Sequence, residues 1–293
     1  MHRRTKIRRP NRASLSSEYL HALPAASADE HSDAERALAE AQARRLESEI
    51  QSLRQDLSEA AQVQHLLNGP RELRRGSFEI ACETFPVRQV SGDFCTVFDV
   101  GGRTAFALGD IAGKGLTAGM WFTHIISLVR FHAATNTDPA AAMTTINREL
   151  CSLRLERPLI TVFLGSLDWS ANTLTCCRAG HPPPVLIRAN AGPELSHEGG
   201  PVLGVVENAE FEAGTTTFGP GDGLLAYSDG LSELKNEQGE EFGICRLLDE
   251  AERCDRISAV SMLFRMLGAV KDFAGGGQPD DDITMMALLR NCA

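Results

Sequence analysis

The sequence predicts an α+β fold with mainly antiparallel sheets, preceded by a long N-terminal helix. Two observations lead to this prediction. Apolar segments of strand length recur from residue 78 onward, and two pairs of longer, helix-like segments interrupt them, an order that favours layers of helices and antiparallel strands. Before them, a stretch rich in Ala, Leu, Glu, Arg and Gln runs without Pro or Gly up to Gly69, as expected for a long helix.

The chain begins with a basic stretch, "MHRRTKIRRPNR", that has almost no large apolar residues. We predict that residues 1–28 form a disordered tail, because such a composition cannot bury a core. A tether to nucleic acid or to an anionic surface is the less favoured alternative.

Residues 29–70 are predicted to form a coiled-coil helix ahead of the main domain. Apolar side chains repeat at alternating spacings of four and three, which is the pattern of a heptad seam. The seam consists of Leu46, Ile50, Leu53, Leu57 and Ala60, followed by Gln64 and Leu67. Because this stripe is too narrow for a core helix, we predict a homodimer through residues 39–67. The alternative is one solvated helix packed on the body by its stripe.

Residues 71–293 are predicted to form one domain. Strands are expected within residues 78–87, 96–111, 159–180, 184–189, 211–218, 222–229 and 283–289. Helices are expected within residues 115–134, 139–154, 243–254 and 258–274. Gly101-Gly102 and residues 170–172 mark hairpin turns, and Pro139 suits the first turn of the second helix.

The composition argues against several classes of function. A formal net charge of −10 disfavours nucleic acid as the main partner of the body. The sequence has neither a run of about 18 apolar residues nor a secretory signal, so we expect a cytoplasmic protein without a membrane span. Its eight cysteines form no C-x-x-C pair and no zinc-type cluster, and we expect reduced, mostly buried thiols.

Four aspartates stand at the edges of apolar segments. They are Asp93 in "SGDF", Asp110 in "LGDIAGKG", Asp229 in "AYSDGL" and Asp281 in "PDDDIT". Aspartate is also a common turn residue, so spacing alone leaves open whether the four converge. If they converge, no neighbouring run of Arg or Lys offsets their charge. Divalent cations that prefer oxygen ligands, Mg²⁺ or Mn²⁺, would then supply the missing positive charge.

Six motifs follow one another between about Phe78 and Leu289. They are "SGDF", "GDIAGKG", "AGHPPPVLI", "GGPVLG", "GDGLLAYSDGLSELKNEQGEEFG" and "DDIT". In order and separation they resemble the metal-dependent Ser/Thr protein phosphatases of the PPM type, and most closely the bacterial RsbU/SpoIIE-like branch. The resemblance implies a two-sheet antiparallel β-sandwich flanked by helices, with two Mn²⁺ or Mg²⁺ ions at one sheet edge.

The resemblance also implies a set of metal ligands. Asp110 matches the carboxylate that bridges the two metals, and the main-chain carbonyl of Ile111 matches an oxygen that binds one of them. Asp229 matches the ligand of the "DG" motif, and Asp281 matches the acid of the terminal motif. Asp93 matches an early acid that binds metal directly or through water.

The sequence departs from the family pattern at three positions. Ser91 precedes Gly92 where the family usually has a second glycine, and Arg178 replaces a frequent asparagine. Thr96 stands where the family often has an acid. This last departure puts a third metal in doubt.

The implied function is hydrolysis of phosphoserine or phosphothreonine in a protein. Asp110 and Asp229 would act through a water that the two metals activate for direct, in-line attack on phosphorus. Analogy with the family suggests a phosphorylated STAS-domain (anti-anti-sigma-like) regulator of bacterial signalling as substrate. Two alternatives stay open: a non-catalytic pseudophosphatase that recruits a partner through its coiled coil, and a metal-dependent hydrolase of small phosphoesters.

Further residues near the motifs have expected roles of their own. Lys114 either contacts the substrate phosphate or is a solvated loop lysine. His181 in "AGHPPP" is expected to be structural rather than a general acid. Asp282 is expected to support the site from behind, whereas Asp280 is expected to be solvated and Asp222 to form a turn.

Overall fold

The computed structural model of the chain describes residues 28–153, 158–254 and 256–292. The predicted basic tail falls on residues 1–27, which lie outside the described residues, and on Ala28. The chain divides into two compact units, Met1–Leu53 and Arg54–Ala293. Within the described ranges, no helix combines the length and the apolar character that crossing a bilayer requires.

The first helix, α1 (Ala28–Asn68), is continuous and ends at Gly69, whose φ of +84° is left-handed. Its predicted seam has two different environments. Leu46, Ile50 and Leu53 are 57%, 49% and 61% exposed. Gln64, in the second unit, is buried. The long N-terminal helix is therefore confirmed, and its last turns belong to the domain that follows.

Two six-stranded sheets form the body of the second unit. The first sheet has the order β1 (Glu72–Arg75), β2 (Phe78–Phe85), β12 (Ile283–Arg290), β11 (Gly223–Tyr227), β7 (Val185–Ile187) and β8 (Glu194–Leu195). The second has the order β10 (Gly214–Thr217), β6 (Thr173–Ala179), β5 (Ile160–Asp168), β4 (Arg103–Ile111) and β3 (Phe94–Val100), with β9 (Gly199–Gly200) beside β6. Apart from the short parallel pair β6–β9, neighbouring strands are antiparallel.

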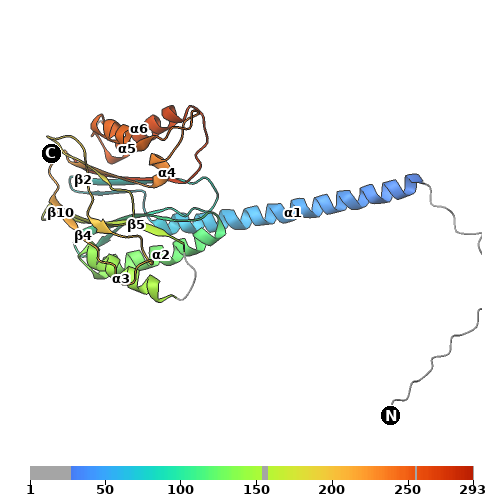
Figure 1. Cartoon of the computed structure of the whole chain (residues 1–293), viewed down its shortest axis with the longest axis horizontal. Helices are drawn as coiled ribbons and strands as arrows, with labels where there is room; N and C mark the ends of the chain where they lie inside the picture. Colours follow the sequence, from blue (N-terminus) through green and yellow to red (C-terminus); the bar gives the residue numbers. More distant parts are fainter. Residues whose placement is uncertain (1–27, 154–157, 255, 293) are drawn as a thin grey trace, which may run out of the picture. The chain divides into compact units, whose positions relative to one another are not determined.

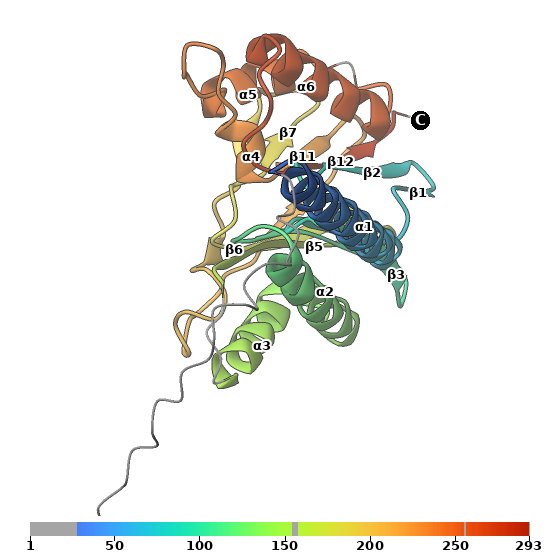
Figure 2. The same ribbon diagram turned by 90° about the vertical axis from the view of Figure 1, so that its right-hand side faces the viewer.

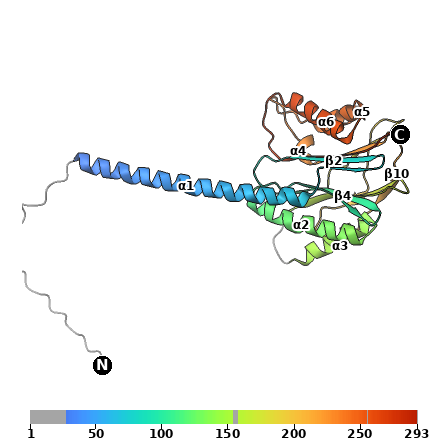
Figure 3. The same ribbon diagram turned by 180° about the vertical axis from the view of Figure 1, so that it is seen from behind.

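Helices cover the outer face of each sheet, as Figure 1 and the reverse view in Figure 3 show. The second sheet is covered by α2 (Leu116–Thr135) and α3 (Pro139–Ser152). The first sheet is covered by α5 (Gly243–Glu252) and α6 (Ala259–Ala274), with the short α4 (Asp229–Ser232) at the end of β11. Figure 2 shows the two helical layers on opposite sides of the strands. The predicted α+β sandwich is therefore confirmed.

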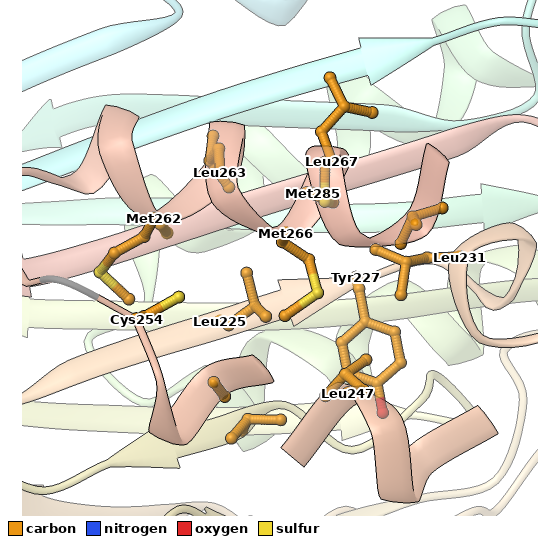
Figure 4. Close-up of a cluster of buried hydrophobic side chains, with 14 of the residues drawn as sticks. Leu225, Tyr227, Leu231, Leu247, Cys254, Met262, Leu263, Met266, Leu267 and Met285 are labelled. Carbon is orange, nitrogen blue, oxygen red and sulfur yellow. The ribbon is translucent and has the colours of Figure 1, made fainter. Parts of the chain in front are cut away.

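Three apolar clusters hold these layers together. One lies between the two sheets, one between the second sheet and α2 and α3, and one between the first sheet and α5 and α6. In the last cluster, Met262 and Met266 of α6 and Leu247 of α5 pack toward Leu225 and Tyr227 of β11 (Figure 4). This packing fixes β11, the strand that ends just before Asp229.

The predicted turns are confirmed, and four short elements were missed: β1, β8, β9 and α4. Gly101 and Gly102 have φ of +54° and +84°, and Asn172 has φ of +53°, as tight hairpins require. Strand β1 was missed because its sequence "ELRR" is polar and mostly exposed. Helix α4 was missed because it has only four residues, and β8 and β9 were missed because they have two residues each.

Candidate metal centre

The fold brings the four aspartates to one end of the sandwich. Adjacent antiparallel strands begin and end together, so residues that follow one strand meet residues that precede its neighbour. Asp93 precedes β3 and Asp110 lies at the end of β4, one step beyond the pair Phe94 and Gly109. By the same geometry Asp229 follows β11 and Asp281 precedes β12.

Asp93 is the most deeply buried of these carboxylates, with 3% of its surface exposed. Its Oδ2 atom is buried and has no hydrogen-bond partner among the described residues. Burial, and next the negative charge of Asp110, raise the pKa of Asp93 well above its ordinary value. A buried carboxylate oxygen that receives no hydrogen bond is suited to binding a cation.

Asp110 and Asp229 extend the same negative region. Burial raises the pKa of Asp110 from 3.8 to about 6, and the charge of Asp229 adds to this effect. Burial also raises the pKa of Asp229, with a further contribution from the charge of Asp281. The carboxylates therefore affect one another, which means that the fold has brought them within electrostatic range.

The main-chain carbonyl of Ile111 faces the loop that carries Asp93. A Cβ atom on Gly92 would lie 2.5 Å from the Ile111 oxygen, so only glycine fits there. The next residue, Ala112, donates a hydrogen bond of 2.9 Å to the Leu159 carbonyl, which holds the chain after β4. Ile111 O and the Asp93 carboxylate are thus presented on neighbouring segments.

Asp282 organises the loop before β3. Its Oδ1 accepts a hydrogen bond from Val87 N at 2.7 Å. Its Oδ2 accepts from Ser91 Oγ at 2.6 Å and from Gly92 N at 3.3 Å. Ser91 Oγ accepts in turn from Asp93 N at 2.9 Å. Asp282 therefore supports the position of Asp93, as the sequence predicts.

The "DG" motif is explained by close backbone packing. A Cβ atom on Gly230 would lie 2.1 Å from the Asp282 carbonyl oxygen. The neighbouring Ser228 donates from its main-chain nitrogen to Thr284 O and accepts from Thr284 N at its hydroxyl, both at 2.9 Å. These contacts fasten the end of β11 to the start of β12, and with it Asp229 to the terminal acidic segment.

The end of α1 contacts the same loop, which sequence reasoning missed. Gln64 Nε2 donates to Ser91 O at 3.0 Å, and Gln64 Oε1 accepts from Ser91 N at 3.1 Å. Asn68 Oδ1 accepts from Cys95 N at 3.3 Å. The heptad spacing predicts Gln64 in the dimer seam, but its side chain forms hydrogen bonds within its own domain. The signal that could have revealed this contact is the polar residue within an apolar stripe.

Asp281 is the outlying member of the four. Its side chain is 56% exposed, and its Oδ2 lies 3.2 Å from Lys114 Nζ. In the part of the chain that the structure describes, no three or more histidine, cysteine or acidic side chains are close enough together to hold a metal ion as they stand. Asp110 thus lies within electrostatic range of Asp93 and of Asp229, while Asp281 contacts a lysine.

Two other conspicuous residues have structural roles. His181 is 1% exposed, and its Nδ1 lies 2.9 Å from Thr161 Oγ1. Burial lowers the pKa of His181 to about 3, so the ring is neutral at pH 7 and is a poor general acid. Asp222 accepts hydrogen bonds from Ala189 N and Gly219 N, both at 2.9 Å, and forms a turn as expected.

These features fit divalent metal ions. The unpartnered Oδ2 of Asp93 and the cradle at Gly92 offer oxygen atoms to a common region, and all the donors are carboxylates or carbonyls. Hard cations such as Mg²⁺ and Mn²⁺ prefer such ligands. Within the described residues, no cysteine or histidine competes in this set; Cys95 is buried, and burial raises the pKa of its thiol.

The sequence matches the model of one protein family, Stage II sporulation protein E (SpoIIE), over residues 100–291. Protein IcfG of Synechocystis sp. is 26% identical over 234 residues, covering 70% of this chain and 37% of IcfG. Phosphoserine phosphatase RsbU of Bacillus subtilis is 24% identical over 244 residues, covering 82% of this chain and 71% of RsbU. The chain thus spans much less than half of IcfG and about seven-tenths of RsbU.

Solved structures share the fold. The SiaA-PP2C domain of Pseudomonas aeruginosa has a TM-score of 0.69 at 17% identity, covering 83% of this chain and 98% of that one. RsbX in complex with magnesium has a TM-score of 0.57 at 13% identity, covering 74% of this chain and 97% of that one. At these identities the likeness concerns the arrangement of the two sheets and their helices.

Proposed function

This chain belongs to the SpoIIE family and carries its PP2C-type phosphatase domain, and from this premise we propose that it is a metal-dependent protein-serine/threonine phosphatase. The observation that carries the proposal is the buried Asp93 carboxylate, whose Oδ2 has no hydrogen-bond partner among the described residues. Asp110 lies beside it in the register of β3 and β4, and Asp229 and the Ile111 carbonyl approach the same place. Such a cluster of ionised carboxylates is costly to bury without a compensating positive charge.

In this proposal two Mg²⁺ or Mn²⁺ ions are held by Asp93, Asp110, Asp229, Asp281 and the Ile111 carbonyl. When bound, the ions supply a lowered pKa for an attacking water and neutralise charge on the phosphoryl oxygens. The magnesium complex of RsbX, a protein with the same fold, supports this choice of metal. The chain's own contribution is to aim oxygen ligands from four separate segments at one region.

The substrate that we propose is a phosphoserine or phosphothreonine residue of a regulatory protein. The relative RsbU is a phosphoserine phosphatase, which supports this chemistry. The finer proposal, a phosphorylated STAS-domain regulator in a bacterial signalling pathway, rests on analogy with the family.

The test is dephosphorylation by the purified chain with Mn²⁺. We expect it to release phosphate from a phosphoserine-containing STAS-domain protein much faster than from free phosphoserine at equal concentration. No turnover of either substrate would indicate a pseudophosphatase. Equal turnover of the protein and of small phosphoesters would indicate a hydrolase without protein specificity.

Gly92→Ala tests the ligand role of the Ile111 carbonyl. The new Cβ would lie 2.5 Å from that oxygen, so one of the two segments has to move. Because a misplacement of about 1 Å can cost on the order of a hundredfold in rate, we expect turnover to fall at least about tenfold and Mn²⁺ affinity to weaken. Gly192→Ala is the control, since nothing lies within 4 Å of its added Cβ. Wild-type turnover and Mn²⁺ affinity in Gly92→Ala would contradict the role of Ile111.

We further propose that the chain is a homodimer through α1, within residues 39–67. Leu46, Ile50 and Leu53 keep about half or more of their surface exposed, and they repeat with heptad spacing. Full burial of each such side chain contributes about 1.5–3 kcal/mol of favourable free energy. Summed over two chains, this is enough to support association. Because Gln64 binds Ser91, the dimer seam depends mainly on the earlier positions.

The dimer is tested with the double substitution Leu46→Glu and Ile50→Glu in the full chain. Placing charges in a coiled-coil seam opposes pairing, so we expect a monomer by light scattering at concentrations where the wild type is a dimer. The control is Ser48→Glu, which adds a charge on the opposite side of the helix. If the wild type is itself a monomer, or if the double variant stays a dimer, the proposed seam is wrong.

A further inference from the structure

Lys114 joins two loops of the candidate centre. It lies between β4 and α2, and its Nζ atom is 3.2 Å from Asp281 Oδ2. Nζ also donates a hydrogen bond to the main-chain carbonyl of Asp280. The flanking Gly113 and Gly115 have φ of +115° and +80°, left-handed values that favour glycine. The ammonium group therefore lies against a carboxylate that we assign to the metals.

The surroundings of this ion pair are strongly acidic. Lys114 and Asp281 line a cavity of about 130 Å³ together with Asp229, Glu233 and a second lysine, Lys235. The positive charge of Lys114 acts on Asp229 as well, where it opposes the rise in pKa that burial causes. Lys114 thus influences two of the proposed metal ligands.

We propose that Lys114 is an exchangeable counter-ion of the metal centre. Its ammonium group holds Asp281 in the metal-free protein, and a divalent cation that binds Asp281 displaces it. This inference rests on the proposed function, because it requires Asp281 to be a metal ligand.

Displacement is physically easy. The Lys114 and Asp281 side chains are 38% and 56% exposed, and ion pairs of this kind contribute little to stability. A lysine reaches its partner through a flexible four-carbon stem, so the ammonium group can move away without moving the loop. A divalent cation bound to Asp281 would also repel the ammonium group of Lys114 if that group stayed in contact with the carboxylate.

The proposal predicts that removing the ammonium group tightens metal binding. Lys114→Met leaves a side chain of similar length without the charge, so the cation no longer competes for Asp281. Calorimetric titration of the metal-stripped full chain with Mn²⁺ measures this effect. We expect the dissociation constant to fall by about threefold to tenfold, the range that losing one exposed ion pair and one nearby repulsion would give.

Two comparisons identify the cause. In an Asp281→Asn background, Lys114→Met should no longer tighten Mn²⁺ binding, because the contested carboxylate is gone. Lys235→Met removes a charge from the same cavity, but among the described residues Lys235 forms no ion pair with Asp281. Because Lys235 does not contact Asp281, its removal frees no carboxylate for the metal, so we expect Lys235→Met to change the dissociation constant less than Lys114→Met does.

The results separate this inference from the function on which it rests. If the wild type binds Mn²⁺ and Lys114→Met binds it equally or more weakly, Lys114 is not a counter-ion that the metal displaces. If Lys235→Met tightens binding as much as Lys114→Met, the effect is one of net charge and the inference also fails. If the wild type shows no saturable Mn²⁺ binding, the proposed metal centre itself is wrong.

Discussion

Replacing Asp110 or Asp229 by Asn is expected to lower the turnover of p-nitrophenyl phosphate by at least about a hundredfold, or roughly 2.7 kcal/mol of activation barrier. Each substitution keeps the shape of the side chain and removes the charge that would hold a metal. Asp280→Asn is the matched control, because its carboxylate belongs to the same acidic segment but is not assigned to the metals. Near wild-type turnover in Asp110→Asn would contradict the assignment.

The same variant has a second expected effect that does not depend on activity. The pKa of Asp110 is raised in the folded protein from 3.8 to about 6, so the folded state holds this proton more tightly than the unfolded state. The contribution of Asp110 to the stability of the metal-free protein therefore falls as the pH rises from about 4 to about 6. Above that range the ionised Asp110 carboxylate destabilises the folded, metal-free protein. An asparagine at this position cannot ionise, so the variant avoids this cost.

Metal-free Asp110→Asn should therefore be more stable than the metal-free wild type at pH 7.5, by about 1–3 kcal/mol. The difference should disappear below about pH 3, where Asp110 is protonated in both the folded and the unfolded state. Chemical denaturation at the two pH values, with EDTA present, measures it. A variant that is less stable than the wild type at pH 7.5 would show that Asp110 makes stabilising contacts beyond those described above.

Removing the metal is expected to abolish activity. After treatment with EDTA, hydrolysis of p-nitrophenyl phosphate should fall to the background rate and return on addition of Mn²⁺ or Mg²⁺, because the proposed ligands are all oxygen atoms. The folding stability of the protein should also fall when the metal is removed and rise when it is added back. At a hundred times its dissociation constant, a bound metal raises the free energy of unfolding by about 2.7 kcal/mol.

The melting temperature of the wild type should therefore rise with Mn²⁺, and that of Asp110→Asn should rise much less. Full activity in EDTA would exclude the two-metal proposal. A thiol mechanism has its own test in Cys95→Ser, which should keep wild-type turnover because Cys95 is a buried thiol. Loss of activity in a folded Cys95→Ser protein would support a thiol mechanism.

The positions of the candidate ligands could be predicted because these residues lie at strand ends. Asp93 and Asp110 border β3 and β4, and Asp229 and Asp281 border β11 and β12. Apolar segments, glycine turns and polar edges are local signals, so the sequence by itself determined the longer strands, the hairpins and the motif order. The resemblance to a known family then related the four aspartates to one another, which spacing alone left open.

Only the tertiary structure decided which side chains meet across long stretches of chain. Gln64 contacts Ser91 across 27 positions, and Asp282 binds the hydroxyl of Ser91 across 191. Lys114 contacts the main chain of Asp280 across 166. Periodicity and turn chemistry extend over one helical turn or one strand, and they carry no information about such pairs. These contacts follow from how the two sheets and the end of α1 pack together, because packing sets the distances between the loops at the edge of the sandwich.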